Sequence, residues 1–278
     1  MLAPRLEASL APLAARPLRA RTNSVARRAA IENCLLAAVP RETYRRLAAR
    51  LEPVVLTFGE ILYEPGDAIG HVYFPGASLV SLLTLADGHL ALEVGLIGRE
   101  GMVGVPLMLG HPVSPVRALV QAGGTAMRMA ATDFFREFRL SVPLQDELYR
   151  YTHALMAQIS QTAACNRFHV VERRLARWLL MTQDRVKSDQ FRMTHEFLAH
   201  MLGVRRVGVT NAARRLQQRK LIDYRRGNIT VLDRDGLEAA ACDCYEAVRD
   251  MHEGAPTGPA TRPATRTATR KLRISAAA

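Results

Sequence analysis

The spacing of hydrophobic and polar residues changes along the chain and predicts three kinds of structure. Residues 31–52 place apolar side chains at helical spacing. Residues 54–129 instead alternate short β-type runs with glycine, proline and aspartate, which is typical of an all-β sandwich or barrel-like domain. Asp87-Gly88, between two leucine-rich runs, predicts a hairpin turn. The apolar positions of the first segment are Leu35, Leu36, Val39, Leu47 and Leu51.

From about residue 142 the third pattern begins, with apolar residues at steps of three or four and no glycine in the run. It continues for about five turns, which predicts a long amphipathic helix. Such a length favours a helix–helix partner, and we interpret the stripe as the seam of a homodimer. Packing against the rest of the same chain is the alternative. The seam residues would be Leu148, Tyr151, Leu155, Ile159 and Thr162.

Residues 194–220 satisfy three constraints of a helix-turn-helix together. Ala199 is small where two helices would cross, and Gly203, four residues on, tolerates the positive φ of a tight turn. Val209, six residues further, is the apolar residue that would face the first helix. We therefore expect helix 195–202, a turn at Gly203-Val204 and a second helix over 205–220. An ordinary helical hairpin with a basic surface is the alternative.

The second helix would present a polar, basic face outward, as a helix that reads the major groove must. Two short strands around the Arg-Gly-Asn turn at 226–228 indicate a wing, whose arginines would meet phosphates. Arg206 is expected to read a base. The full set expected to contact double-stranded DNA is Arg205, Arg206, Val207, Thr210, Asn211, Arg214, Arg215, Arg225 and Arg226.

The distribution of charge supports a polyanionic partner. The net charge is +12, and residues 187–226 hold ten basic and three acidic side chains. Such clustering within a folded segment is the electrostatic footprint of a polyanionic partner. A solvated basic face is the alternative. The termini, 1–28 and 255–278, are also basic, and their low-complexity sequences predict disordered tails.

Other functional classes find little support. No apolar run is long enough for a membrane span, and we expect a cytoplasmic protein that does not bind membranes. There is no Ser/His/Asp constellation, carboxylate pair or phosphate loop, so we expect no enzyme activity. His195-Glu196-x-x-x-His200 is one residue too long for a zinc-protease motif, and both histidines are interpreted as surface residues close to DNA. Cys242-x-Cys244 lacks a second pair, so we expect no metal site and no resident cofactor.

In these features the sequence resembles the Crp/Fnr family of bacterial transcription regulators over about residues 31–240. The resemblance is strongest over 194–237, in the Leu-Gly-Val-Arg-Arg turn, in Arg-Arg-Leu-Gln and in the Gly-Leu-Glu after the wing. Segments 58–60 and 63–67 resemble the first strands of the family's cyclic-nucleotide-binding-type β-roll, and 170–180 resembles its hinge helix. The resemblance implies an α+β fold with an N-terminal β-roll of the double-stranded β-helix jelly-roll type, a long dimerisation helix and a C-terminal winged helix-turn-helix.

The departures from the family pattern concern the effector. Nucleotide-binding members grip the cyclic phosphate with an Arg-Ser or Arg-Thr pair, and the matching positions here are Pro112 and Val113. Without a cation there, a cyclic phosphate would lose its charge-assisted hydrogen bonds, so we do not expect cyclic AMP as the effector. Cys34 stands alone near the N-terminus, so the iron–sulfur cluster of oxygen-sensing members is not expected either. The effector pocket is expected at Glu100, Gly101, Val103 and Arg117.

Together these features predict a homodimeric, sequence-specific transcription regulator with RNA polymerase as a further candidate partner. A cyclic-nucleotide-binding signalling module without specific DNA binding is the alternative. The expected order along the chain is a disordered tail at 1–28, a sensory β-roll at 29–141, a dimerisation helix at 142–169, a winged helix-turn-helix at 170–240, a C-terminal helix at 241–254 and a disordered tail at 255–278.

Overall fold

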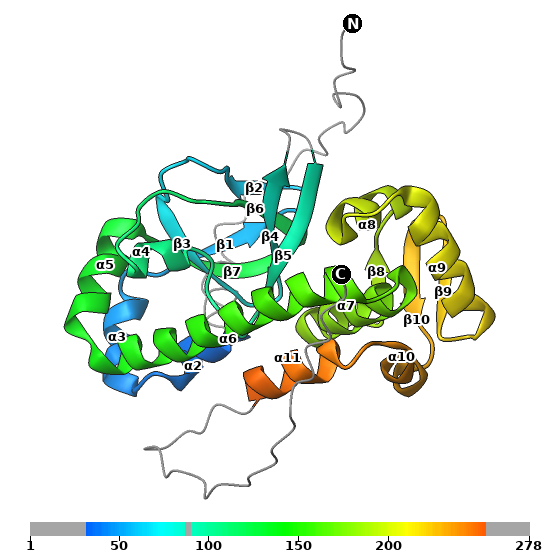
Figure 1. Ribbon diagram of the computed structural model, residues 1–278. Coiled ribbons are helices and arrows are strands. Elements are labelled where there is room, and N and C mark those ends of the chain that lie inside the picture. The colour runs from blue at the N-terminus through cyan, green and yellow to red at the C-terminus, as the bar shows by residue number, and fades with distance from the viewer. Residues whose placement is uncertain (1–31, 87–89, 254–278) are drawn as a thin grey trace, which may run out of the picture.

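The computed structural model describes residues 32–86 and 90–253. A β-rich lobe and a smaller, mostly helical lobe lie side by side, and one long helix runs along both of them (Figure 1). The α+β fold class expected from the sequence is confirmed. Both predicted tails and the Asp87-Gly88 turn lie outside the described residues.

The β-rich lobe is a roll of two antiparallel sheets. One sheet has the order β1-β7-β3 and the other β2-β6-β4-β5. Strands β4 and β5 pair antiparallel from Val80 opposite Ile97 to Ala86 opposite Leu90, with a register shift between Leu82 and Leu83. The strands are β1 Glu52–Leu56, β2 Ile61–Tyr63, β3 His71–Pro75, β4 Leu79–Ala86, β5 Leu90–Ile97, β6 Arg117–Ala122 and β7 Gly124–Ala130, and the short helices are α4 Val105–Met108 and α5 Ala131–Leu140.

The N-terminal helical segment differs from its prediction. It forms two helices, α2 (Cys34–Ala38) and α3 (Arg41–Ala48), and Glu52 already belongs to β1. The break falls at Val39 and Pro40 because proline disfavours helical geometry in the residue before it. The five apolar residues of the segment are nevertheless all buried in the core of the roll.

Helix α6 (Val142–Phe168) is the long helix, and it corrects the predicted dimer seam. Leu148, Tyr151 and Leu155 are 0%, 7% and 5% exposed in a single chain, because they pack into the core of its own roll. Ile159 packs against the same core, and the Thr162 hydroxyl accepts a hydrogen bond from Arg177 at 3.0 Å. Leu148, Tyr151 and Leu155 were therefore wrongly assigned to the seam, since a periodic stripe defines a buried face but not its partner. Ile159 and Thr162 are only partly buried, and their place in a seam stays a prediction.

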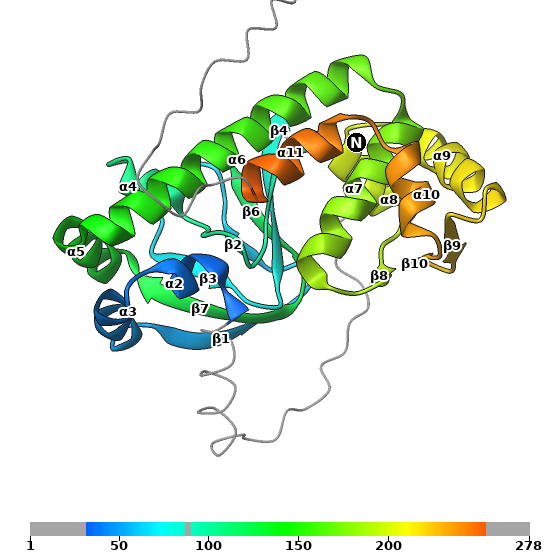
Figure 2. The same cartoon turned by 90° about the horizontal axis from the view of Figure 1, so that it is seen from below.

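The helical lobe contains a helix-turn-helix and a three-stranded sheet whose first strand precedes it in the chain. The sheet has the order β8-β10-β9; α9 packs against β9, and α7 packs against α9 and α10. Helix α11 lies along α6 (Figure 2). The elements are α7 Val171–Val186, β8 Gln190–Arg192, α8 His195–Leu202, α9 Arg206–Gln218, β9 Ile222–Arg225, β10 Asn228–Val231, α10 Arg234–Ala240 and α11 Cys244–Glu253. Among the described residues, no helix combines the length and the apolar character needed to cross a membrane.

Candidate nucleic-acid interface

Helix α8 begins and ends as its sequence predicts. The Thr194 side chain caps its N-terminus by accepting a hydrogen bond from the Phe197 amide at 3.1 Å. Gly203 ends the helix with a φ of 59°, a left-handed conformation that glycine adopts without steric cost. Ala199 is buried, and its carbonyl accepts the Val204 amide at 3.0 Å to close the turn. The turn therefore fixes where α9 starts.

Helix α9 has two chemically distinct faces. Val209, Ala213 and Leu216 are buried in the core of the lobe. The opposite face carries exposed side chains, including Val207, which is 62% exposed. The other exposed residues of α9 and its N-cap that were expected to meet DNA are Arg205, Arg206, Asn211, Arg214 and Arg215. The helix thus presents guanidinium and amide donors along one surface, which is the chemistry that reads base edges and phosphates.

Two of the predicted DNA contacts also serve the fold. The Thr210 hydroxyl donates to the Arg206 carbonyl at 3.0 Å and is hydrogen-bonded to Nδ1 of His195, also at 3.0 Å. Arg215 lies 3.5 Å from a carboxylate oxygen of Glu172 at the start of α7. These contacts engage the Thr210 hydroxyl between α8 and α9, whereas Arg215 remains mostly exposed beside its acidic partner.

His195 is half-buried, so it lies less openly at the surface than the sequence predicted. Its ring stacks on Tyr224 of β9, with centroids 4.2 Å apart. Burial, together with the nearby Arg206 guanidinium, lowers the pKa of His195, so the neutral imidazole is favoured. His200, in contrast, is exposed. His195 therefore links α8, α9 and the wing, whereas His200 is at the surface as predicted; the proximity of both to DNA stays a prediction.

The wing is a tight β-hairpin. Arg226 and Gly227 connect β9 to β10, and both have positive φ, 50° and 80°. Positive φ at both central residues is the requirement of a type I′ turn, which suits the twist of the two strands. Arg225 and Arg226 are exposed at its tip, and Arg225 lies 3.1 Å from Asp223. The hairpin lies beside α9 (Figure 1), so its exposed arginines add a second basic surface next to that helix.

Comparison with known families agrees with this geometry. Residues 173–240 match the model of the Crp-like helix-turn-helix domain. The helical lobe therefore contains a Crp-like helix-turn-helix domain. The resemblance to Crp/Fnr regulators that the sequence indicated is confirmed.

Solved Crp/Fnr structures share the fold across both lobes. The c-di-GMP-responsive global regulator CLP of Xanthomonas campestris is 18% identical, with a TM-score of 0.58, over 69% of this chain and 99% of that one. FixK2 of Bradyrhizobium japonicum is 13% identical, with a TM-score of 0.60, over 69% and 98%. A Crp/Fnr regulator of Thermus thermophilus is 20% identical, with a TM-score of 0.56, over 68% and 98%. At these identities the likeness shows the fold alone. No curated protein matches the chain.

Each of the four residues expected to form the effector pocket contacts another part of this Crp/Fnr fold or is buried in it. Glu100 forms an ion pair with Arg185 of α7 at 2.7 Å, and Arg117 forms one with Glu64 at 2.8 Å. Val103 is fully buried. Gly101 is required for packing, since a Cβ there would lie 2.1 Å from the Tyr151 ring. The effector pocket at these residues stays a prediction, and the local Glu-Gly match did not show that α7 supplies the partner of Glu100.

A cavity of about 180 Å³ lies between the roll and α6, and none of the four residues expected to form the effector pocket lines it. Its wall is almost entirely apolar. It includes Leu82 and Val94 from the sheet and Leu155, Met156 and Ile159 from α6. Pro112 and Val113 do not line it, and Val113 is 47% exposed. The cavity therefore offers shape and apolar surface rather than a cationic grip for a phosphate.

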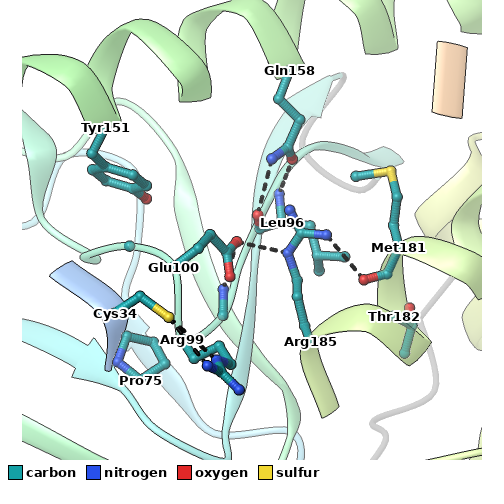
Figure 3. Close-up of polar contacts among 12 residues, drawn as sticks. Cys34, Pro75, Leu96, Arg99, Glu100, Tyr151, Gln158, Met181, Thr182 and Arg185 are labelled. Atoms are coloured by element: carbon teal, nitrogen blue, oxygen red, sulfur yellow. Dashed lines mark hydrogen bonds and ion pairs between the residues drawn. The ribbon is translucent and has the colours of Figure 1, made fainter. Parts of the chain in front are cut away.

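Buried polar contacts connect the roll to α7, and no sequence motif predicted them. Glu100 accepts a hydrogen bond from the Gly98 amide as well as pairing with Arg185, whose Nη1 donates to the Met181 carbonyl (Figure 3). Gln158 of α6 bonds both backbone groups of Leu96 at 2.7 and 3.2 Å (Figure 3). The two lobes and α6 are thus joined through directional contacts.

A second junction contains a buried carboxyl group. Glu93 of β5 accepts hydrogen bonds from Ser81 at 2.7 Å and from the Trp178 indole of α7 at 2.9 Å. Burial raises the pKa of Glu93 to about 7, although both hydrogen bonds favour the charged form. Strand β5, which carries Glu93, also contacts the helix-turn-helix. The Leu92 side chain of β5 lies so close to Gly203 that a Cβ added there would be 2.7 Å from it.

Proposed function

We propose that the protein is a sequence-specific transcription regulator that reads double-stranded DNA with α9 as a homodimer. The observation that carries this proposal is the exposed polar face of α9, which includes Arg206, Asn211 and Arg214. The opposite face of the same helix is buried in the core of the helical lobe. An N-terminal arginine and a mid-helix asparagine are suited to guanine and adenine in the major groove. The wing arginines would hold the adjacent phosphates. As such a regulator it would act in the cytoplasm beside RNA polymerase.

The homodimer would form through the face of α6 that the roll leaves uncovered. Val142, Tyr149 and Met156 are 65%, 52% and 64% exposed and follow one another at intervals of seven residues, and Ala163 continues the series. A seven-residue repeat of apolar positions is the pattern of a two-helix seam. Two-fold symmetry would present two copies of α9 to successive major grooves.

The sensory lobe would respond to something other than cyclic AMP. This proposal is supported by the apolar wall of the cavity beside α6 and by the engagement of Arg117 with Glu64. Isothermal titration of the full chain with cyclic AMP should show no binding in the micromolar range. A saturable, stoichiometric isotherm would refute the proposal and would direct attention to Arg117 as the cation.

Binding-site selection from random DNA tests the function. The full chain should enrich a two-fold symmetric motif. Asn211→Ala should relax one position in each half-site, since the amide can no longer pair with a base. Arg41→Ala, which removes an exposed arginine on α3, is the charge control and should leave the motif unchanged. If the wild-type chain enriches no motif, the proposal fails in favour of a signalling module without specific DNA binding.

A further inference from the structure

Three cysteines and one histidine meet where α6 ends and α11 begins. Cys165 lies in the last turn of α6, and His169 is its C-cap. Cys242 and Cys244 come from the other end of the helical lobe, just before and at the start of α11. Their four ligand atoms all lie within 4.8 Å of one another, and the three thiols are buried. The second pair that the Cys-x-Cys motif lacks in sequence is therefore supplied by the fold.

The distances between these atoms suit one tetrahedral ion. Zn²⁺ bonds to sulfur at about 2.3 Å and to imidazole nitrogen at about 2.0–2.1 Å, which places neighbouring tetrahedral ligands about 3.5–3.8 Å apart. Here the Cys165 and Cys242 sulfurs are 3.5 Å apart, and the Cys244 sulfur is 3.4 Å from Nδ1 of His169. Three thiolates with one imidazole form a common structural zinc ligand set.

A disulfide and an iron–sulfur cluster both fit the observed distances less well than a single ion. A disulfide holds its sulfurs about 2.05 Å apart, which is much closer than the Cys165–Cys242 separation of 3.5 Å. An iron–sulfur cluster distributes its thiolates over several irons. Its four ligand atoms would therefore lie farther apart than they do around a single ion. The observed packing thus favours one metal ion.

The surroundings of the four ligands are arranged for an anionic centre. Gln161 donates a hydrogen bond to the Cys244 sulfur at 3.0 Å. Arg174 and Arg177 are buried and line, together with Cys165, an internal cavity of about 20 Å³. Among the described residues, neither Nε atom of these arginines has a hydrogen-bond partner. Three thiolates, a neutral imidazole and a dication carry one net negative charge, which would offset the cost of burying these guanidinium groups.

We propose that Cys165, His169, Cys242 and Cys244 bind one Zn²⁺ ion per chain. The ion would fasten α11 to the end of α6, because each helix contributes ligands. Its influence would extend to the helix-turn-helix through Arg174, which donates to the Asn166 side chain at 2.7 Å and to the carbonyl oxygen of Leu202 at the end of α8. The site would therefore hold the long helix and the DNA-binding lobe in a fixed relation.

Metal analysis and cobalt substitution test the site. The full chain, free of any histidine tag and purified under reducing conditions from zinc-supplemented cells, should contain one equivalent of zinc by elemental mass spectrometry. After chelation, Co²⁺ should titrate to one equivalent with a sulfur-to-cobalt charge-transfer band and the intense d–d absorption of a tetrahedral site. Cys34→Ser, which removes the one exposed cysteine, is the matched control and should behave like the wild type.

The variant Cys242→Ser/Cys244→Ser should lose the zinc and the charge-transfer band. Gln161→Ala keeps all four ligands and should weaken metal binding by about 10–100-fold, as losses of hydrogen bonds to ligands do. If the double variant does not fold, the wild-type cobalt titration still decides. The proposal is overturned if the reduced wild type takes up only substoichiometric zinc and cobalt, if the cobalt spectrum is octahedral, or if the double variant binds like the wild type.

Discussion

Helices α6 and α9 are both amphipathic and both bury an apolar stripe, yet the surfaces they leave outside differ in kind. Helix α9 buries Val209 and Leu216 and exposes arginine and asparagine. Helix α6 buries Leu148 and Leu155 and still exposes large apolar side chains, including Met156 at 64%. A buried stripe therefore only attaches a helix to its own chain. The remaining face indicates the partner, and we propose that this face binds a polyanion on α9 and a second protein chain on α6.

The exposed face of α6 should account for the largest effect. Tyr149→Glu combined with Met156→Glu places like charges in the proposed seam and should convert a dimer into a monomer in light scattering. Loss of the second DNA-binding lobe should weaken binding to a two-fold symmetric site by about 10²–10⁴-fold, since two linked heads bind with avidity.

The control for this prediction carries the same added charge elsewhere. Val55→Glu with Leu140→Glu replaces two exposed apolar residues of the roll, which are 69% and 68% exposed, and should remain dimeric. A monomeric wild-type protein would contradict the role assigned to α6.

The buried face of α6 should behave in the opposite way. Leu148→Ala creates a cavity in the core of the roll and should reduce the free energy of unfolding by about 2–5 kcal/mol. Chemical denaturation measures this loss, and the mass in solution should stay that of the wild type. A change of oligomeric state with unchanged stability would return Leu148 to the seam first predicted from the sequence.

The titration of Glu93 tests the contact between the β-rich lobe and the helical lobe. Its folded pKa of about 7 lies above the ordinary 4.5, so the folded state binds more protons than the unfolded state between these values. The free energy of unfolding should therefore fall as pH rises through this window, by at most about 1.4 kcal/mol per pH unit. Glu93→Gln should flatten this part of the pH profile in thermal denaturation. Parallel wild-type and variant profiles would show that Glu93 does not titrate there.

Within the DNA surface, α9 and the wing should differ in specificity. Arg206→Ala should cost about 1–3 kcal/mol at the selected site and relax one base position. Arg225→Ala should weaken specific and random DNA alike and reduce the salt dependence, because phosphate contacts release counterions. Fluorescence anisotropy across a salt series separates the two. An equal loss of affinity for specific and random DNA in Arg206→Ala would class Arg206 as a phosphate contact.

Features determined by local spacing could be predicted from the sequence. Ala199, Gly203 and Val209 constrain one another over ten residues, so the helix-turn-helix was found correctly. Features assembled from distant segments could not be predicted. Glu100 meets Arg185 from another lobe, and Cys165 meets Cys242 only after the helical lobe has folded. A one-dimensional pattern contains the period of a helix or the spacing of a turn, but not which distant surface will cover it.

The affinity ratio between the selected site and scrambled DNA of equal length tests the central claim most directly. The full chain should bind the selected site at least about 10³-fold more tightly than the scrambled DNA at physiological salt, as specific DNA-binding proteins do. Asn211→Ala should lower this ratio, and Arg41→Ala should preserve it. Equal affinity for the two DNAs would contradict the account, because the exposed arginines of α9 and the wing would then serve only non-specific attraction to phosphate.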